Sequence, residues 1–79
     1  MVLVGGIVMY FERLRNLRED NDLLQKDIAA LLRISQQYYS QYELGKYTIP
    51  VEFLIMLADH YKVSLDYLVG RTNKKDVSY

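Results

Sequence analysis

The stretch QKDIAALLRISQQYYSQYELG, residues 25–45, decides the fold. Its apolar residues recur at helical spacing on either side of Arg33-Ile34, which indicates two short helices joined by a tight turn. Ala29 is small where one helix must let the other approach closely. Ser35 is a good N-cap for the second helix, because its hydroxyl can accept a hydrogen bond from an otherwise unpaired backbone N–H. Gly45 predicts the end of that helix.

One side of this second helix is polar and carries Gln36, Gln37 and Gln41. A glutamine side chain can hydrogen bond a base edge at two points, so glutamines on one helix face are suited to reading DNA. A solvated helix surface is the alternative interpretation, since polar helix faces are common. We expect Gln36, Gln37 and Gln41 to contact bases.

Composition limits the classes of function. The chain has 79 residues, 51% of them hydrophobic, which suits one small domain with its own core. It has no cysteine and a single histidine, so we expect no disulfide, no metal and no cofactor. The formal net charge is zero, although phosphate binding usually appears as a basic excess. The distribution of charge therefore matters more than its sum.

Helical spacing predicts three further helices, over residues 10–20, 50–61 and 64–70. The fold class expected is all-α, a five-helix domain spanning residues 10–70. Tyr39 and Tyr42 should face its core. The apolar faces expected for the other helices are formed by Tyr10, Leu14, Leu17, Leu24, Ile28, Leu31, Leu32, Val51, Leu54, Leu57, Ala58 and Tyr61.

The two ends of the chain differ from this domain. Residues 1–9, MVLVGGIVM, are apolar but lack the features of a signal peptide and are too few to cross a bilayer as a helix. They are either an extension before a functional start at Met9, or an arm that packs on a partner subunit. Residues 71–79 form a polar tail that we expect to fray. A protein without a membrane segment is expected in the cytoplasm.

Together these features resemble the phage-repressor (Cro-like, XRE) helix-turn-helix family of bacterial and prophage DNA-binding regulators. The resemblance covers residues 10–72 without gaps. Its markers are RLRNLR at 13–18, Leu23, Gln25, IA at 28–29, LL at 31–32, IS at 34–35, YE at 42–43, GK at 45–46, Pro50, LA at 57–58 and VSLDYLVG at 63–70. The resemblance implies that residues 25–45 form the helix-turn-helix, with the second helix in the major groove. Gln36-Gln37 then resembles the base-reading pair of lambdoid repressors, and Gln25 the glutamine that holds a phosphate and braces the first reading residue.

Two positions depart from the family pattern. Leu24 stands where a capping Ser or Thr is usual, so any cap must come from elsewhere. Arg33 stands where the turn usually has Gly, and a left-handed backbone there would cost roughly 1 kcal/mol.

Several residues around the second helix are candidates for holding phosphates or supporting the interface. Lys46 is the best of them, because a loop directly after that helix lies near the backbone of a bound duplex. Ordinary solubilising charge is the alternative for each cation, and Tyr38 is suited either to contacting a sugar or thymine methyl or to covering the core. The full set is Gln25, Ser35, Tyr38, Ser40, Lys46, Lys26 and Arg13.

Enzymatic chemistry is not expected. Asp59, His60 and Ser64 have the residue types of a triad, but Asp59 and His60 are neighbours on one helix and should point apart. The sequence has no glycine-rich phosphate loop and no metal-ligand spacing.

The expected function is sequence-specific binding of double-stranded DNA by a homodimer, as a transcriptional regulator that represses from a palindromic operator. No small-molecule effector is expected, because no sensing domain fits in the remaining residues. The expected dimer contact is formed by Leu65, Leu68 and Val69, because together they have more apolar side chain than so short a helix can bury internally. The alternative is a protein–protein module on the same scaffold, such as an antitoxin or a partner of another regulator.

Overall fold

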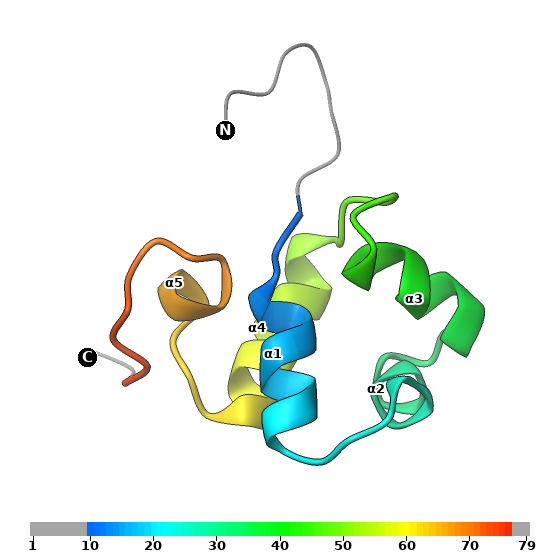
Figure 1. The fold of residues 1–79 in the computed structure, drawn as a ribbon, viewed down its shortest axis with the longest axis horizontal. Coiled ribbons are helices and arrows are strands. Elements are labelled where there is room, and N and C mark those ends of the chain that lie inside the picture. The colour runs from blue at the N-terminus through cyan, green and yellow to red at the C-terminus, as the bar shows by residue number, and fades with distance from the viewer. Residues whose placement is uncertain (1–9, 77–79) are drawn as a thin grey trace, which may run out of the picture.

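Five helices follow one another along residues 10–76, the part of the chain that the computed structural model describes (Figure 1). They are α1 (Arg13–Asp20), α2 (Gln25–Leu32), α3 (Gln36–Glu43), α4 (Val51–Tyr61) and α5 (Leu65–Leu68). The described residues contain no strand, so the all-α prediction is confirmed. The apolar residues 1–9 lie outside the described part, and so do both interpretations of them.

The turn between α2 and α3 has the geometry expected from the sequence. Arg33 is left-handed, with φ 59° and ψ 42°, and its backbone N–H donates to the Ala30 carbonyl at 3.2 Å. The Ser35 hydroxyl accepts from the Tyr38 backbone N–H at 3.0 Å and caps α3. Gly45 follows α3 with φ 77°, a conformation that glycine adopts without strain. These contacts set the angle at which α3 leaves α2.

The N-terminus of α2 is capped although Leu24, at the N-cap position, has no polar side chain. A leucine side chain cannot accept a hydrogen bond, but the Asp27 carboxylate accepts from the Leu24 backbone N–H at 2.8 Å. Asp27 therefore supplies the acidic half of a capping box from within the first turn. The expectation that Leu24 joins the apolar stripe is wrong, because it precedes the helix and is 57% exposed.

The core lies where α1, α3 and α4 meet α2 and α5. Tyr39 is fully buried and Tyr42 nearly so, as predicted. Tyr10 and Val51 were expected on apolar faces, but both are more than half exposed. Each lies at or before the first residue of its helix, where neighbouring helices no longer cover it. The remaining buried apolar residues are Leu14, Leu17, Ile28, Ala29, Leu32, Ile49, Leu54, Leu57, Ala58, Val63 and Leu68.

The segment after α5 folds back onto the domain, so the expected fraying is wrong for residues 71–76. The Lys75 carbonyl accepts from the Ser64 backbone N–H at 2.8 Å. The Arg13 guanidinium donates to the carbonyls of Tyr67 and Thr72 at 2.7 and 2.6 Å, and it lies 4.0 Å from the centre of the Tyr67 ring. These bonds satisfy the Tyr67 and Thr72 carbonyls and fasten the end of α5 and the segment after it to α1. No helix within residues 10–76 is long and apolar enough to span a membrane.

Candidate nucleic-acid interface

Helix α3 has one face in the core and one in solvent. Tyr39, Tyr42 and Glu43 are buried on the inner face. On the outer face Gln36 and Gln37 are exposed, and Gln41 is half-buried. The Gln41 amide makes only a long bond, 3.4 Å, to the Gln37 carbonyl, so the glutamine side chains keep most of their donors and acceptors for a ligand. In Figure 1, α3 lies on the opposite side of the molecule from α5.

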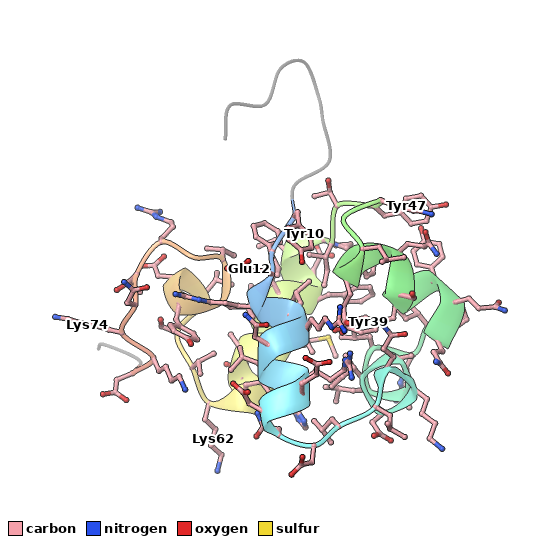
Figure 2. The ribbon with its side chains drawn as sticks, viewed as in Figure 1. Tyr10, Glu12, Tyr39, Tyr47, Lys62 and Lys74 are labelled. Carbon is pink, nitrogen blue, oxygen red and sulfur yellow. The ribbon has the colours of Figure 1, made fainter. Side chains whose placement is uncertain are left out.

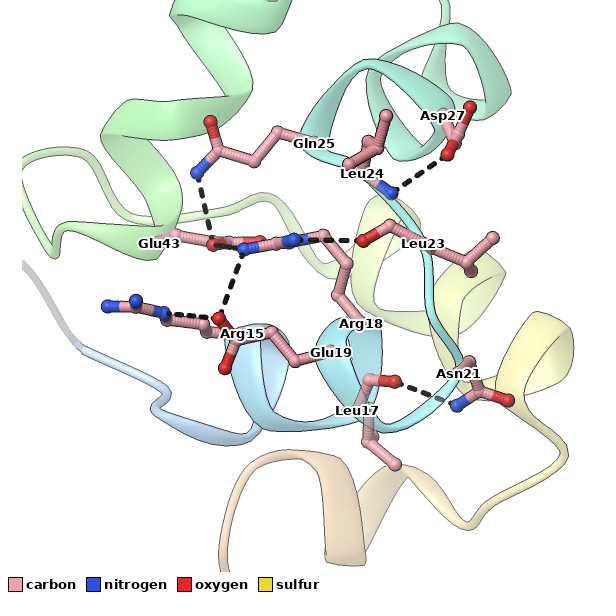
Figure 3. Close-up of polar contacts among 10 residues, drawn as sticks. All are labelled: Arg15, Leu17, Arg18, Glu19, Asn21, Leu23, Leu24, Gln25, Asp27 and Glu43. Carbon is pink, nitrogen blue, oxygen red and sulfur yellow. Dashed lines mark hydrogen bonds and ion pairs between the residues drawn. The ribbon is translucent and has the colours of Figure 1, made fainter.

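A buried ion pair holds the inner face of α3 in place (Figure 3). Arg18 of α1 donates from Nε to Glu43 Oε2 at 2.7 Å and from Nη2 to Glu43 Oε1 at 3.1 Å. Its Nη1 donates to the Leu23 carbonyl at 2.9 Å. The two side chains are 11% and 3% exposed, so both charges are largely removed from water. The pair fixes the C-terminal end of α3 against α1.

This ion pair was not predicted, although the sequence carries a signal for it. Arg18 lies four residues after Leu14, and Glu43 lies four residues after Tyr39. Both charged residues therefore occupy the apolar side of their helices. A charge of each sign on two inward faces would have indicated a buried ion pair, because isolated buried charges are too costly.

The pair is charged at neutral pH. Burial alone would raise the pKa of Glu43, but hydrogen bonds, led by that from Arg18, outweigh it and lower the pKa below its ordinary value. The hydrogen bond to Glu43 in turn raises the pKa of Arg18. Burial, with the nearby Glu43 carboxylate second, raises the pKa values of the Tyr39 and Tyr61 hydroxyls. Both hydroxyls therefore stay neutral at pH 7.

Gln25 joins this network rather than the exposed end of α3. Its Nε2 donates to Glu43 Oε1 at 3.1 Å, from the first residue of α2. The resemblance implied a brace on Gln36, but the described contacts of the Gln25 side chain run to Glu43 instead. This bond uses one N–H of the Gln25 amide, so the carbonyl oxygen and the second N–H of this half-buried side chain take no part in it. Gln25 thus links α2 to the end of α3.

The cationic candidates divide into two groups. Lys46 and Lys26 are exposed, and neither makes an ion pair with any residue in the range 10–76. Lys46 is also well placed, because its backbone N–H donates to the Gln41 carbonyl at 2.9 Å and brings it back beside α3. Arg13 does not belong with them. Its guanidinium is occupied by Tyr67, Thr72 and Asn73 on the α5 side of the molecule, so the geometry favours Lys46 and Lys26 over Arg13 as phosphate contacts.

Among the supporting residues, Ser35 uses its hydroxyl as the α3 cap, and Ser40 is half-buried. Tyr38 is 50% exposed and lies edge-on to Tyr42, with ring centres 5.6 Å apart. It therefore both rests on the core and presents surface to solvent. The two alternatives for Tyr38 in the sequence analysis are compatible with each other.

The expected dimer residues are placed differently from one another. Leu68 is fully buried in the core and is unavailable to a partner, because α5 points it inward. Leu65 is 36% exposed and Val69 is half-buried. A groove of about 450 Å³ lies beside Leu65, between α4, the start of α5 and the returning segment, with Ile55, Val63 and Thr72 in its wall. Ile55 is 48% exposed and was not anticipated.

Asp59 and His60 are both exposed on α4, and His60 contacts the Tyr61 ring edge-on at 5.4 Å. No triad geometry links them to Ser64, whose hydroxyl caps α5 by accepting from the Tyr67 backbone N–H. Within residues 10–76 there is no cluster of three or more His, Cys, Asp or Glu side chains that could hold a metal ion.

Comparison with known proteins gives consistent matches. A family model described as helix-turn-helix matches residues 14–68. The chain is 37% identical over 68 residues to the uncharacterized HTH-type transcriptional regulator YobD of Bacillus subtilis (strain 168), covering 86% of this chain and 61% of that protein. It is 34% identical over 70 residues to the HTH-type transcriptional regulator AnsR of the same organism, covering 89% of this chain and 60% of AnsR.

A solved structure agrees with the sequence matches. The crystal structure of a transcriptional regulator from Listeria innocua superposes with a TM-score of 0.72 and 31% identity, over 78% of this chain and 61% of that one. The chain thus spans about three-fifths of the length of these relatives.

Proposed function

The chain belongs to the XRE-type helix-turn-helix family, and on that basis we propose that it binds double-stranded DNA sequence-specifically through α3 as a transcriptional regulator. The observation that carries the proposal is the outer face of α3, where Gln36 and Gln37 are exposed and Gln41 is half-buried with only one long hydrogen bond, while buried hydrogen bonds hold the inner face. Each glutamine can engage the N6 and N7 groups of an adenine together. The relatives are named as transcriptional regulators, and this chain is proposed to share that role through residues 10–70.

Rigidity of α3 supports base reading. Arg18, Glu43 and Gln25 tie α3 to α1 and α2 by hydrogen bonds of 2.7–3.1 Å. A helix held in this way enters the groove in one orientation and does not lose much conformational freedom on binding. Lys46 and Lys26 would neutralise phosphates at either end of the helix-turn-helix, although the chain as a whole has no net charge.

We propose further that the regulator is a homodimer acting as a repressor on a palindromic operator. One helix reads only a few base pairs, whereas two related by a two-fold axis about 34 Å apart would read a site long enough to be specific. The groove between α4, α5 and the returning segment is the proposed contact, with Ile55 and Leu65 as its exposed apolar residues. Helix α5 lies on the opposite side of the molecule from α3, as a dimer on DNA requires (Figure 1).

The test is selection of bound sequences from a random duplex pool, followed by binding measurements across a range of salt concentrations. Enrichment of one symmetric motif and a steep loss of affinity with salt are the expected results. Enrichment of an asymmetric motif would keep DNA binding but remove the palindrome and the dimer. Failure to enrich any sequence would remove the DNA-binding function itself.

A protein–protein module, such as an antitoxin or a partner of another regulator, is the second candidate. The zero net charge and the exposed side chains of Ile55, Met56 and Leu65 favour it. Salt separates the two, because an apolar protein interface should not weaken as counterion release does.

A further inference from the structure

An aromatic pair lies beside the face of α3 that carries the glutamines. Tyr38, in the first turn of α3, and Tyr47, in the following loop, have ring centres 5.3 Å apart at an angle of 43°. Tyr38 is 50% exposed and Tyr47 is 48% exposed. Two large rings half in water contribute less to the core than buried ones would. A role in packing therefore accounts for only part of their surface.

The pair is held in place from both sides. Tyr38 contacts the buried Tyr42 edge-on at 5.6 Å, and Tyr42 contacts Phe53 at 6.3 Å, so a row of rings runs from the core to the surface. The Tyr47 backbone N–H donates to the Gln41 carbonyl at 3.3 Å, which draws the loop back onto α3. Figure 2 shows Tyr47 at the outer end of this loop, on the α3 side of the molecule. The rings are thus presented in one orientation.

The position of the two rings relative to the glutamines indicates that they would contact the sugar-phosphate backbone beside the DNA groove. Successive residues of a helix are about 100° apart, so Tyr38 lies a quarter-turn or so round α3 from Gln37. When Gln37 faces the base edges, Tyr38 and its neighbour Tyr47 face sideways. The major groove is about 12 Å wide and little broader than a helix, so a side chain on the flank meets sugar and phosphate.

The charge of the chain points to the same contact. Ten Lys and Arg side chains are balanced by ten Asp and Glu side chains, so the chain has no net positive charge to attract phosphates, and Arg13 and Arg18 are already engaged inside the fold. Neutral donors can add to the backbone contact without adding charge, and a tyrosine hydroxyl is one that donates to phosphate oxygens. Lys46, which makes no ion pair with the described residues, stands next to Tyr47 in the chain.

We propose that Tyr47, supported by Tyr38, is a DNA-backbone contact of this protein: its ring packs on a deoxyribose and its hydroxyl donates to a phosphate beside the groove that α3 enters. The inference rests on the proposed DNA-binding function and adds to the DNA contacts a residue, Tyr47, that was not predicted from the sequence. Because the hydroxyl is neutral and reads no base, it should strengthen binding to every sequence equally.

The experiment compares Tyr47→Phe with Tyr67→Phe in the full chain, on a duplex from the selection and on a shuffled duplex of equal composition. Tyr67 lies in α5, so its variant makes the same change far from α3. We expect Tyr47→Phe to weaken both duplexes by the same factor, about three- to tenfold, with an unchanged salt slope. Tyr67→Phe should change neither affinity. Denaturant midpoints equal to wild type would show that both variants remain folded.

A methylphosphonate scan then identifies the phosphate. Each phosphate of the selected duplex is replaced in turn, and at one position the loss caused by Tyr47→Phe should disappear, because both changes remove the same hydrogen bond. Additive losses at every position would overturn the proposal. A loss confined to the selected duplex would overturn it as well, in favour of a base contact. The proposed function is tested separately. If the wild type binds the selected duplex and Gln37→Ala weakens that binding, DNA binding through α3 stands whether or not Tyr47 contacts a phosphate.

Discussion

The guanidinium of Arg18 and the carboxylate of Glu43 form two hydrogen bonds, at 2.7 and 3.1 Å, between α1 and the end of α3. The bonds join side chains that are almost completely buried. A buried pair of this kind contributes little net stability over a well-packed apolar pair, but it restricts the fold to arrangements in which the two charges meet. Here that restriction falls on the helix proposed to read DNA.

Replacing Arg18 by Met should destabilise the fold by about 3–5 kcal/mol, because the Glu43 carboxylate is then left buried without its partner. Urea unfolding of the two proteins measures the difference. Arg15→Met is the matched control on the same helix. Its ion pair with Glu19, at 3.2 Å, is exposed, so the expected change is within about 0.5 kcal/mol.

The double variant Arg18→Met with Glu43→Leu tests whether the unpaired Glu43 carboxylate causes the loss of stability in Arg18→Met. Removing both charges eliminates the unpaired carboxylate, so most of the lost stability should return. If the double variant were as unstable as Arg18→Met, the cost would lie in packing rather than in the buried charge.

Acid should destabilise the wild type through Glu43. The pKa of this group is lowered in the folded state, so its contribution is complete above the ordinary pKa of Glu, about 4.3. That contribution is lost as the pH falls from this value through the lowered folded pKa. Glu43→Gln should be less stable than wild type at pH 7 but should lose less on acidification. Urea midpoints from pH 7 to pH 2 give both curves, and parallel curves would contradict the assignment.

Local signals predicted the parts of the fold that local chemistry determines. The turn at Arg33, the cap at Ser35 and the end of α3 at Gly45 follow from a few adjacent residues, and the structure has all three. Contacts between distant residues were out of reach. Arg18 meets Glu43 across 25 positions, and Arg13 meets Asn73 across 60, so no short pattern contains either contact.

The dimer residues show a different limit. The apolar content of the short last helix pointed to Leu65, Leu68 and Val69, but it could not say which of them the core would cover. The answer depends on how α5 is rotated against α4 and α1, and it placed Leu68 fully inside. The exposure of Ile55 beside Leu65 depends on the same packing and appears only in three dimensions.

The structure favours Lys46 over Arg13 as a phosphate contact, and a pair of variants tests this difference. Lys46→Ala should weaken binding to any duplex and reduce the salt slope by about one unit. Arg13→Ala should leave the slope unchanged and destabilise the fold by about 1–3 kcal/mol, because three hydrogen bonds to the returning segment are lost. A lower slope for Arg13→Ala would return it to the interface.

Base reading by α3 predicts a loss of specificity in two single variants. Gln36→Ala and Gln37→Ala should each weaken binding to the selected duplex by about 1–3 kcal/mol while hardly changing affinity for random duplex. Both side chains are exposed, so folding should be unaffected. Competition titrations with the two duplexes measure the ratio. Equal losses on both would indicate a phosphate contact instead of a base contact.

The left-handed Arg33 predicts that glycine is better than alanine at that position. A side chain with a Cβ is strained at φ 59°, by about 1 kcal/mol, and glycine is not. Part of the gain is offset because glycine makes the unfolded chain more disordered. We therefore expect Arg33→Gly to be equal to wild type or more stable by up to about 1 kcal/mol, and clearly more stable than Arg33→Ala.

Two other positions make the comparison decisive. Lys62, with φ 58° and ψ 43°, should show the same preference for glycine over alanine. Asn16 is an exposed residue in the middle of α1, where glycine should be worse than alanine by about 1 kcal/mol. Urea midpoints for the six variants give three differences, of which the first two should have one sign and the third the other. If alanine were better than glycine at Arg33, that residue would be right-handed in solution, and the turn that sets the angle of α3 would differ from this structure.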